Sequence, residues 1–214
     1  MRAAGEATRQ RILAEAKKEF AEHGLAGARI NRIATNAQAS KERLYAYFAT
    51  KEELFDAVCV EVIQSTADAV RFSATDVPGF AGRLFDHYVA EPDTVRLYDR
   101  ISLDGSGDFR LHAARVYQDK VEDLQRAQKA ADIDQSWDPT ILLSMLLGIV
   151  RLMTTERRLP GSTSEARPNR QELRAAVVRA AEKLVQPMAD VAPPRDCQEN
   201  GSGALSVASV GDLS

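Results

Sequence analysis

The sequence has few of the residues that several functional classes require. Its only two cysteines, Cys59 and Cys197, lie far apart and form no CxxC motif, which is typical of a reduced, cytoplasmic setting. The three histidines, His23, His87 and His112, lack the spacing of metal ligands. We therefore expect neither a bound metal nor another cofactor.

Long apolar runs are also missing. The longest run, Ile141 to Val150, is interrupted by Ser144 and Gly148, and it is only half of the roughly 20 residues that a membrane-spanning helix needs. The first eleven residues are polar and charged and lack the apolar segment of an export signal. We expect a cytoplasmic protein that does not bind membranes. The sequence also lacks a nucleophile–base pair or a glycine-rich phosphate loop, so we do not expect an enzyme.

The residues that are present favour helices. The chain has 214 residues, of which 44% are hydrophobic and 28% charged, enough for one large domain or two smaller ones. Apolar residues recur at helical spacing and strand-like alternation is scarce, which predicts an all-α fold of about nine helices. Their expected ranges are about 6–23, 30–36, 40–48, 51–72, 80–90, 92–103, 109–131, 139–158 and 170–185.

The charge is distributed unevenly along the chain. The net charge is −3, but residues 1–50 carry nine Lys and Arg against five Asp and Glu, and the remaining residues carry an acidic excess. A basic head on an acidic body indicates an anionic partner at the N-terminal end only.

The basic head has the pattern of a helix-turn-helix. A short helix at residues 30–36 is followed by a turn at Gln38-Ala39 and by a helix that Ser40 is suited to cap. In this last helix Leu44 and Phe48 lie four residues apart and would face the core. The opposite face and its flanks would then carry the polar side chains Lys41, Glu42, Arg43, Tyr45 and Tyr47.

Each exposed side chain suits a task on DNA. Arg43 can donate two hydrogen bonds to guanine, and Glu42 can accept one from the amino group of cytosine. Ser40, Tyr45, Tyr47 and Lys51 suit contacts to phosphate, and Lys51 lies in the first turn of the fourth helix, where free N–H groups favour an anion. The alternative is a helical hairpin whose polar face is only solvated.

The segment from about Thr8 to Val58 resembles the DNA-binding domain of the TetR (tetracycline repressor) family. The matching pieces are Arg11-Ile12-Leu13 with Ala16 and Phe20, then Gly24, then Ile33-Ala34, and above all the run SKERLYAYFATKEELFDAV from Ser40 to Val58. The resemblance implies a homodimer, an effector pocket in the C-terminal part, and DNA-contact roles for Lys41, Arg43, Tyr45, Tyr47 and Lys51.

Four positions depart from the family pattern. Ala28 and Arg29 stand where Ser or Thr is common, which removes a helix cap, although Arg29 can supply a charge to phosphate. Gln38 stands where Gly is usual, so we expect it in a left-handed conformation. Glu42 stands where a small residue is usual, and its carboxylate would repel phosphate unless it pairs with Arg43 or reads a base.

Two C-terminal helices are expected to form a dimer interface. Apolar residues cover most of the circumference of the helix at 139–158, and those of the helix at 170–185 form a narrower stripe with small residues. We predict half of an intersubunit four-helix bundle, with both helices lying in the core of a monomer as the alternative. The predicted interface residues are Leu142, Met145, Leu146, Ile149, Leu173, Val177, Ala180 and Leu184.

Aromatic residues between 75 and 135 are expected to shape a pocket for an apolar or aromatic effector. Phe85, Tyr88 and Tyr98 would line it, and His112 or Arg115 would be a polar anchor. The alternative is that these aromatic residues only fill the core.

Together these features predict a sequence-specific transcriptional regulator, a repressor that a small molecule releases from a near-palindromic DNA operator. We assign residues 1–50 to DNA binding, 51–186 to ligand binding and dimerisation, with residues 51–72 as a connecting helix, and 187–214 to a disordered tail. The alternatives are a helical protein-interaction module and an enzyme that contains a helix-turn-helix-like bundle.

Overall fold

The computed structural model describes residues 2–104, 107–155 and 168–187, without the side chains of residues 2–3, 102–104, 107–110 and 112. Over these residues the chain forms α-helices, one 3-10 turn and no strand, as predicted. The helices are α1 (Arg2–Gly27), α2 (Ile30–Asn36), α3 (Lys41–Tyr45), α4 (Lys51–Ala69), η1 (Ala74–Asp76), α5 (Val77–Ala90), α6 (Pro92–Asp104), α7 (Gly107–Lys129), α8 (Pro139–Thr154) and α9 (Arg170–Val185).

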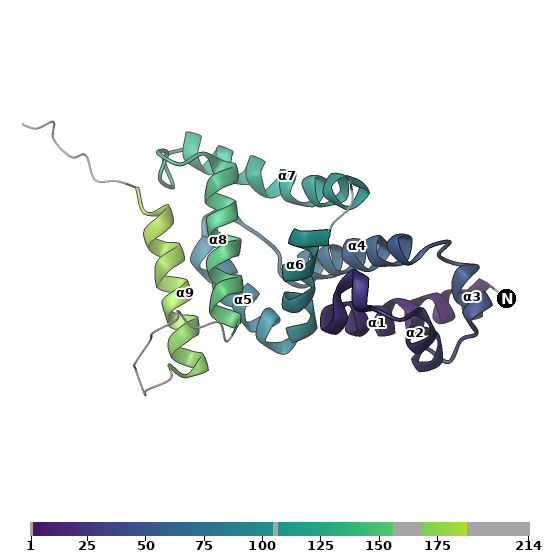
Figure 1. Ribbon diagram of the computed structural model, residues 1–214. Coiled ribbons are helices and arrows are strands. Elements are labelled where there is room, and N and C mark those ends of the chain that lie inside the picture. The colour runs from purple at the N-terminus through teal and green to yellow at the C-terminus, as the bar shows by residue number, and fades with distance from the viewer. Residues whose placement is uncertain (1, 105–106, 156–167, 188–214) are drawn as a thin grey trace, which may run out of the picture.

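The helices separate along the length of the molecule. Helices α1, α2 and α3 form one end, α5, α8 and α9 lie toward the other, and α4 runs from the first group into the second (Figure 1). Helix α5 packs against both α8 and α9, and α6 packs against α1. No helix in the described part of the chain is long and apolar enough to cross a membrane.

Side-chain caps fix several helix starts. The Ser40 hydroxyl accepts a hydrogen bond from the Arg43 N–H at 3.1 Å, as predicted. At α4 the Thr50 hydroxyl accepts from the Glu53 N–H, but the Glu53 carboxylate accepts from the N–H of Ala49 and not from that of the capping residue. A complete capping box is present at α9, where Asn169 and Glu172 accept from each other's backbone N–H groups.

Several predicted helix bounds were wrong by three or four residues. Helix α1 begins at Arg2 and not at residue 6, and α8 ends at Thr154 and not at residue 158. Helix α3 ends at Tyr45 and not at Phe48, because the chain turns there to bring Phe48 into the core. Helix α4 ends at Ala69 and not at residue 72. Helix α5 begins at Val77 and not at residue 80, because the Asp76 carboxylate caps it and a proline is tolerated in the first helical turn.

Helix α1 is interrupted near its end. Gly24 has φ 67°, a left-handed conformation that a residue with a side chain adopts at a cost, and helical structure continues to Gly27 beyond this kink. The predicted stop at Gly24 is therefore a kink, after which the chain turns toward α2.

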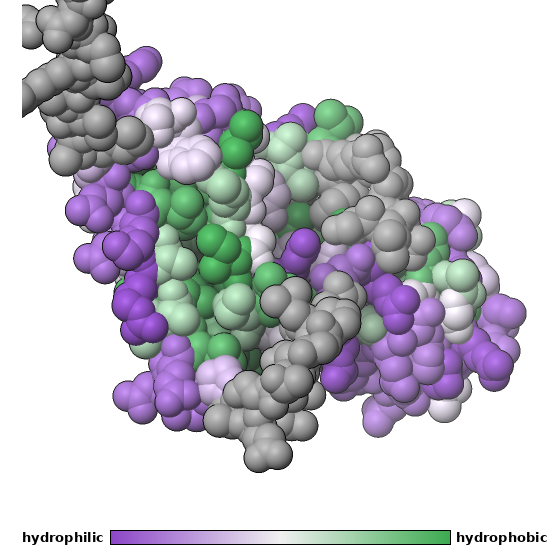
Figure 2. All heavy atoms as spheres, turned by 60° about the vertical axis from the view of Figure 1, so that its left-hand side comes forward, coloured by the Kyte–Doolittle hydropathy of each residue, from purple (hydrophilic) through white to green (hydrophobic). Residues whose placement is uncertain are grey.

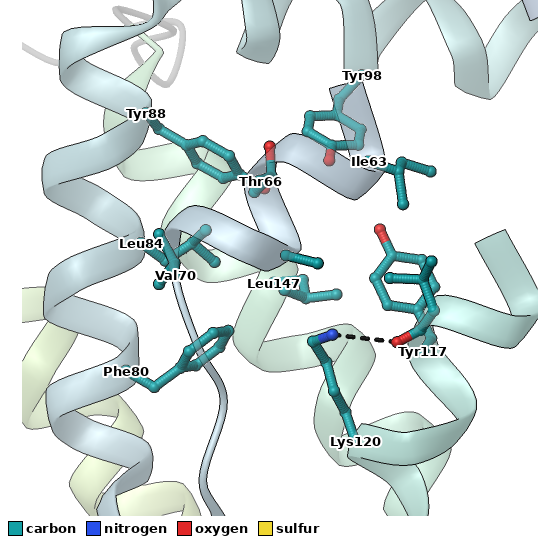
Figure 3. Close-up of a pocket in the computed structure, with 12 residues that line it drawn as sticks. Ile63, Thr66, Val70, Phe80, Leu84, Tyr88, Tyr98, Tyr117, Lys120 and Leu147 are labelled. Carbon is teal, nitrogen blue, oxygen red and sulfur yellow. Dashed lines mark hydrogen bonds between the residues drawn. The ribbon is translucent and has the colours of Figure 1, made fainter. Parts of the chain in front are cut away.

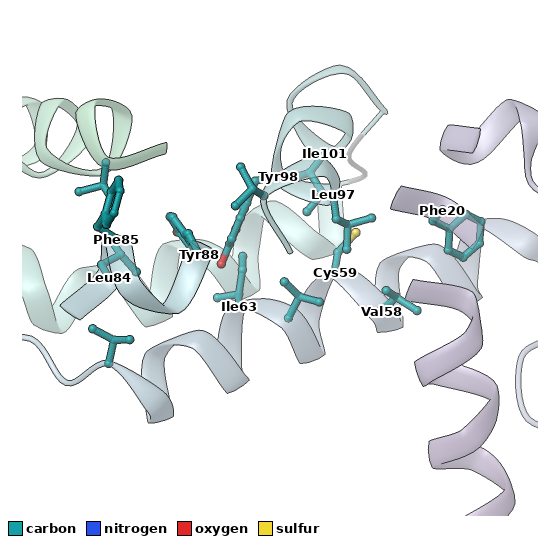
Figure 4. Packing of buried hydrophobic residues seen from close by; sticks show 14 of the residues in the cluster. Phe20, Val58, Cys59, Ile63, Leu84, Phe85, Tyr88, Leu97, Tyr98 and Ile101 are labelled. Atoms are coloured by element: carbon teal, nitrogen blue, oxygen red, sulfur yellow. The ribbon is translucent and has the colours of Figure 1, made fainter. Parts of the chain in front are cut away.

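One hydrophobic core joins the two ends of the molecule (Figure 4). Near the N-terminal end, the rings of Phe20 in α1 and Phe55 in α4 meet edge to face at 5.1 Å between centroids. Further along α4, Cys59 and Ile63 are buried in the same cluster as Leu97 of α6. Because α4 contributes to both ends, a shift of this helix moves apolar contacts in both.

Candidate DNA-binding surface and effector pocket

The outer face of α3 is polar and its inner face is apolar, as the spacing predicted. Leu44 and Phe48 are buried, whereas Lys41, Glu42 and Arg43 are exposed. The Lys41 ammonium lies 5.9 Å from the centre of the Tyr45 ring, and Tyr45 itself is 40% exposed. A cation and a phenol therefore stand side by side on the surface, an arrangement that suits a phosphate.

Tyr47 and Lys51 are less accessible than the residues of α3. The Tyr47 hydroxyl donates a 2.9 Å hydrogen bond to the carbonyl of Gly5, which ties the start of α1 to the end of the helix-turn-helix. Lys51 Nζ donates at 3.4 Å to the carbonyl of Ala26. Both side chains are half-buried, so each presents only part of its surface to a partner.

Glu42 does not pair with Arg43 in this structure. Hydrogen bonds from its own backbone N–H and from the Ser40 hydroxyl lower the pKa of the Glu42 carboxyl below its ordinary value, and the Lys41 charge adds to this. The Arg43 guanidinium lies instead 6.0 Å from the centre of the Tyr47 ring. The two side chains are therefore free of each other and can contact different groups.

A buried carboxylate that sequence reasoning missed anchors α2. Glu19 Oε1 accepts from the Arg29 N–H at 2.8 Å, and the Arg32 guanidinium pairs with the same carboxylate at 2.7 Å. The Arg29 side chain makes no cap. The Glu19 carboxylate of α1 instead fixes the start of α2 through the N–H of Arg29 and the side chain of Arg32. Burial alone would raise the pKa of Glu19, but the bonds from Arg32 and Arg29 outweigh it and lower the pKa.

The exposed side of α2 forms a groove beside α3. Its lining includes the predicted Arg29 and Lys41 together with Asn31, Thr35 and Asn36, which the sequence analysis did not single out. Their only sequence signal was a polar side of a seven-residue helix. The turn that follows contains Gln38 at φ 53°, which confirms the expected left-handed conformation.

Three tyrosines from three helices meet near the middle of the molecule (Figure 3). Tyr88 of α5, Tyr98 of α6 and Tyr117 of α7 line two neighbouring hollows. The inner hollow has about 20 Å³ and reaches Thr66 and Lys120, and the outer one has about 280 Å³ and lies against α8. Burial raises the pKa of all three phenols, so they remain neutral hydrogen-bonding groups at physiological pH.

Three of the five predicted pocket residues need a different description. Phe85 is fully buried in the core but lines neither hollow. Arg115 lies on the exposed side of α7. His112 is on α7, but its side chain lies outside the described residues. Besides the tyrosines, the polar groups at the hollows are instead Thr66, Lys120, Thr140, Ser144 and Arg151.

Helix α8 has three different faces. Leu142, Leu146 and Val150 are buried in the core of the subunit, and Ser144, Leu147 and Arg151 line the outer hollow. The third face is an apolar stripe in which Ile141 is 55% and Leu152 is 52% exposed, with Met145 between them.

The predicted interface therefore divides into two sets. Leu142 and Leu146 of α8 and Val177 of α9 pack inside their own subunit, so their assignment to an interface was wrong. A helix that is apolar all round does not reveal in its sequence which side meets the core. The remaining predicted residues keep exposed area: Met145, Ile149, Leu173, Ala180 and Leu184. We call the exposed stripe of Ile141, Met145 and Leu152 on α8, together with Leu173, Ala180 and Leu184 on α9, the outer apolar face. Figure 2 shows apolar side chains gathered on this side of the molecule.

The comparisons with known proteins agree with this arrangement. The family model of bacterial regulatory proteins of the tetR family matches residues 12–58, and that of the tetracyclin repressor-like C-terminal domain matches residues 76–183. Over 151 residues, 67% of this chain and 77% of the relative, the sequence is 35% identical to the HTH-type transcriptional repressor SCO4008 of Streptomyces coelicolor. The chain belongs to the TetR family.

Solved structures give the same result. The transcriptional regulator SCO4942 from Streptomyces coelicolor is 37% identical, with a TM-score of 0.73 over 83% of this chain and 98% of that one. A TetR family regulator from Marinobacter aquaeolei is only 20% identical but shares the fold, with a TM-score of 0.70 over 86% of this chain and 98% of that one. This TetR-family protein is thus a DNA-binding transcriptional regulator and not an enzyme.

Proposed function

We propose that this TetR-family regulator is a dimeric repressor that binds a near-palindromic operator. A small molecule that binds in the tyrosine-lined pocket would cause it to dissociate from the DNA. The observation that carries the proposal is the division of α3 into a buried face and an exposed face of Lys41, Glu42 and Arg43. Relatives over part of this chain are named as transcriptional repressors in Streptomyces coelicolor and Pseudomonas putida, which supports repression.

The proposed DNA contacts follow from position and chemistry. Arg43, on the exposed face of α3, would read a base edge in the major groove, and Glu42 would accept from a neighbouring base. Phosphates on either side would be held by the remaining cations, hydroxyls and amides around the groove of α2: Arg29, Asn31, Thr35, Ser40, Lys41, Tyr45, Tyr47 and Lys51.

The outer apolar face is proposed as the dimer interface. Isoleucine, methionine and leucine side chains of α8 face solvent beside the stripe of Leu173, Ala180 and Leu184 on α9. Apolar area of this kind is stabilised by burial at about 25 cal/mol per Å², and the small Ala180 allows close approach of helices. A second copy placed there gives two α3 helices, as a near-palindrome requires.

Two helices connect the pocket to the DNA-binding end. Tyr98 of α6 lines the pocket, and Arg100 of the same helix donates to the carbonyl of Glu22 in α1 at 3.4 Å. The start of α6 is also held, because Lys17 of α1 pairs with Glu91 at 3.0 Å. Helix α4 carries Thr66 into the pocket and Phe55 against α1. A ligand that displaces either helix would change the spacing of the α3 helices, at a coupling of about 1–3 kcal/mol.

DNA binding is tested by selecting bound fragments from random DNA and titrating the selected operator by fluorescence anisotropy. We expect Arg43→Ala to weaken operator binding by about 5- to 150-fold and to relax the preference at one base pair. Lys129→Ala, which removes an exposed cation at the end of α7, is the matched control and should change nothing. Equal losses on the operator and on random DNA for Arg43→Ala would contradict the assigned reading role.

The dimer is tested by sedimentation. Ile141→Glu places a charge on the outer apolar face and should give folded monomers that lose specific operator binding. Gln171→Glu adds a carboxylate to an exposed position of α9 away from that face and should remain dimeric. A dimer that survives Ile141→Glu would move the interface elsewhere.

A further inference from the structure

The inner hollow contains a lysine, Lys120, for which the described residues provide no ion-pair partner; the nearby carboxylate of Asp119 acts on it only through its charge. Lys120 of α7 is half-buried and lines this hollow beside Phe80 and Leu147 (Figure 3). Its Nζ donates one hydrogen bond, 3.0 Å long, to the carbonyl of Val116 in the preceding turn, and it lies 5.9 Å from the centre of the Tyr117 ring. Its sequence neighbour Asp119 is exposed and favours the charged form of Lys120, but this effect is smaller than that of burial.

The charged side chains in the lining of the two hollows are both cations. Arg151 lines the outer hollow, at 3.7 Å from Asp99, and Lys120 lines the inner one. No Asp or Glu belongs to the described lining of either hollow. The remaining polar groups are hydroxyls of Tyr, Thr and Ser, which can donate to an anion as readily as they can accept.

An ammonium in this position is costly without a counter-ion. Removing a charged group from water is unfavourable unless it is paired and hydrogen-bonded, and burial accordingly lowers the pKa of Lys120. One carbonyl satisfies only one of the three donors of the ammonium. A ligand anion would satisfy a second donor and compensate the charge, so this position would hold an anion more strongly than a neutral group of the same shape.

We propose that the effector is amphipathic, with one carboxylate that pairs with Lys120 and an apolar body that occupies the outer hollow. This inference rests on the proposed effector pocket and names its ligand class. The inner hollow, at about 20 Å³, has room for a group close in size to one or two water molecules, which suits a carboxylate. The outer hollow, at about 280 Å³, has Val121, Leu143 and Leu147 in its walls and suits a small hydrocarbon or aromatic body.

Three probes with one skeleton and different charges test the ligand class. 4-Butylbenzoate, 4-butylbenzyl alcohol and 4-butylbenzylamine are titrated into the full-length protein by calorimetry and by thermal shift. We expect the benzoate to bind at least about tenfold more tightly than the alcohol, and the amine to bind most weakly. Benzoate binding no tighter than that of the alcohol, tightest binding by the amine, or no binding of any probe would overturn the proposal.

Variants at one helix position test the role of Lys120. Lys120→Met keeps the length of the side chain and removes its charge, so the preference for benzoate over alcohol should disappear, whereas Lys120→Arg should keep it. Lys129→Met on the same helix is the matched control and should behave as the wild type. The unliganded Lys120→Met protein should also melt at a higher temperature, because a half-buried charge is gone. An unchanged benzoate preference in Lys120→Met would contradict the counter-ion role.

Operator binding by the unliganded wild-type protein is measured alongside. Its absence would contradict the proposed function. If the operator is bound but the three probes bind with equal affinity, only the proposed ligand class would be contradicted.

Discussion

The two ends of the molecule expose opposite kinds of surface. At the end formed by α1, α2 and α3, the apolar residues are buried and the outer side chains are cations, amides and phenols. At the end formed by α8 and α9, one side of each helix is also buried in the core, but the side chains of Ile141 and Leu152 are more than half exposed. Both ends belong to one continuous core, so the difference lies in what each leaves outside it.

That difference indicates how each end meets its partner. Charged side chains are stable in water, so the polar end can bind and release an anionic partner without a large cost in either state. Apolar area exposed to water is unfavourable in the free state, so the other end gains from a lasting partner. Reversible DNA binding and permanent self-association match these two surfaces.

The largest effect should come from truncating a side chain on the core face of α8, compared with one on its outer apolar face. Leu146→Ala removes a fully buried side chain and should cost about 2–5 kcal/mol at any protein concentration. Ile141→Ala should leave the stability of the isolated subunit within about 0.5 kcal/mol, with its effect confined to dimer dissociation. Urea denaturation over a hundredfold range of concentration checks both, and equal losses would remove the distinction between a core face and an outer apolar face.

A second effect concerns the buried polar anchor of the DNA-binding end. Glu19→Gln keeps the shape but loses the ion pair with Arg32, which should cost about 1–3 kcal/mol. Because the pKa of Glu19 is lowered in the folded protein, this stabilisation is present above the ordinary carboxyl pKa of about 4.5 and is lost as the pH falls below it.

Thermal unfolding between pH 7 and pH 3 measures this effect. The difference between wild type and Glu19→Gln should shrink toward acidic pH. A difference that stays constant over this range would mean that the charge of Glu19 does not stabilise α2.

A smaller effect is expected from a residue that contacts phosphate and does not read a base. Lys51→Ala should weaken binding to the operator and to random DNA by the same few-fold factor. It should also lower the magnitude of the slope of log affinity against log salt concentration by about 1. The half-buried Lys51 keeps one bond to the carbonyl of Ala26, so its contribution should be below that of Arg43. Anisotropy titrations at several salt concentrations decide this, and a loss confined to the operator would give Lys51 a reading role.

The smallest effect is expected from Gln38→Gly in the turn between α2 and α3. Gln38 has φ 53°, which glycine adopts without strain, so Gln38→Gly should raise the stability by about 0.5 kcal/mol despite the added freedom of the unfolded chain. Gln38→Val should lower it by about 1–2 kcal/mol, because a β-branched residue is poorly tolerated there. Calorimetry should rank Gly above Gln above Val, and another order would contradict the strain at this turn.

The boundary between the DNA-binding and effector regions, predicted at residue 50, remains a prediction. The two family models match residues 12–58 and 76–183, and α4 lies across the predicted boundary at residue 50. Phe55 of α4 packs against Phe20 of α1, whereas Ile63 and Thr66 of the same helix line the pocket. A connecting helix shared by both regions is what the proposed release of DNA requires.

The sequence by itself determined the helices, the start of α3 and the conformation of Gln38, because each depends on neighbours within a few residues. It also determined which face of α3 is exposed, since only one face of that helix is apolar. Tertiary structure alone decided which side of α8 is buried, because that helix is apolar all round. It alone placed Glu19 against α2 and Lys120 beside the three tyrosines. These contacts join residues distant in the chain, and the packing of α1, α5, α6 and α7 sets their distances, which local spacing does not encode.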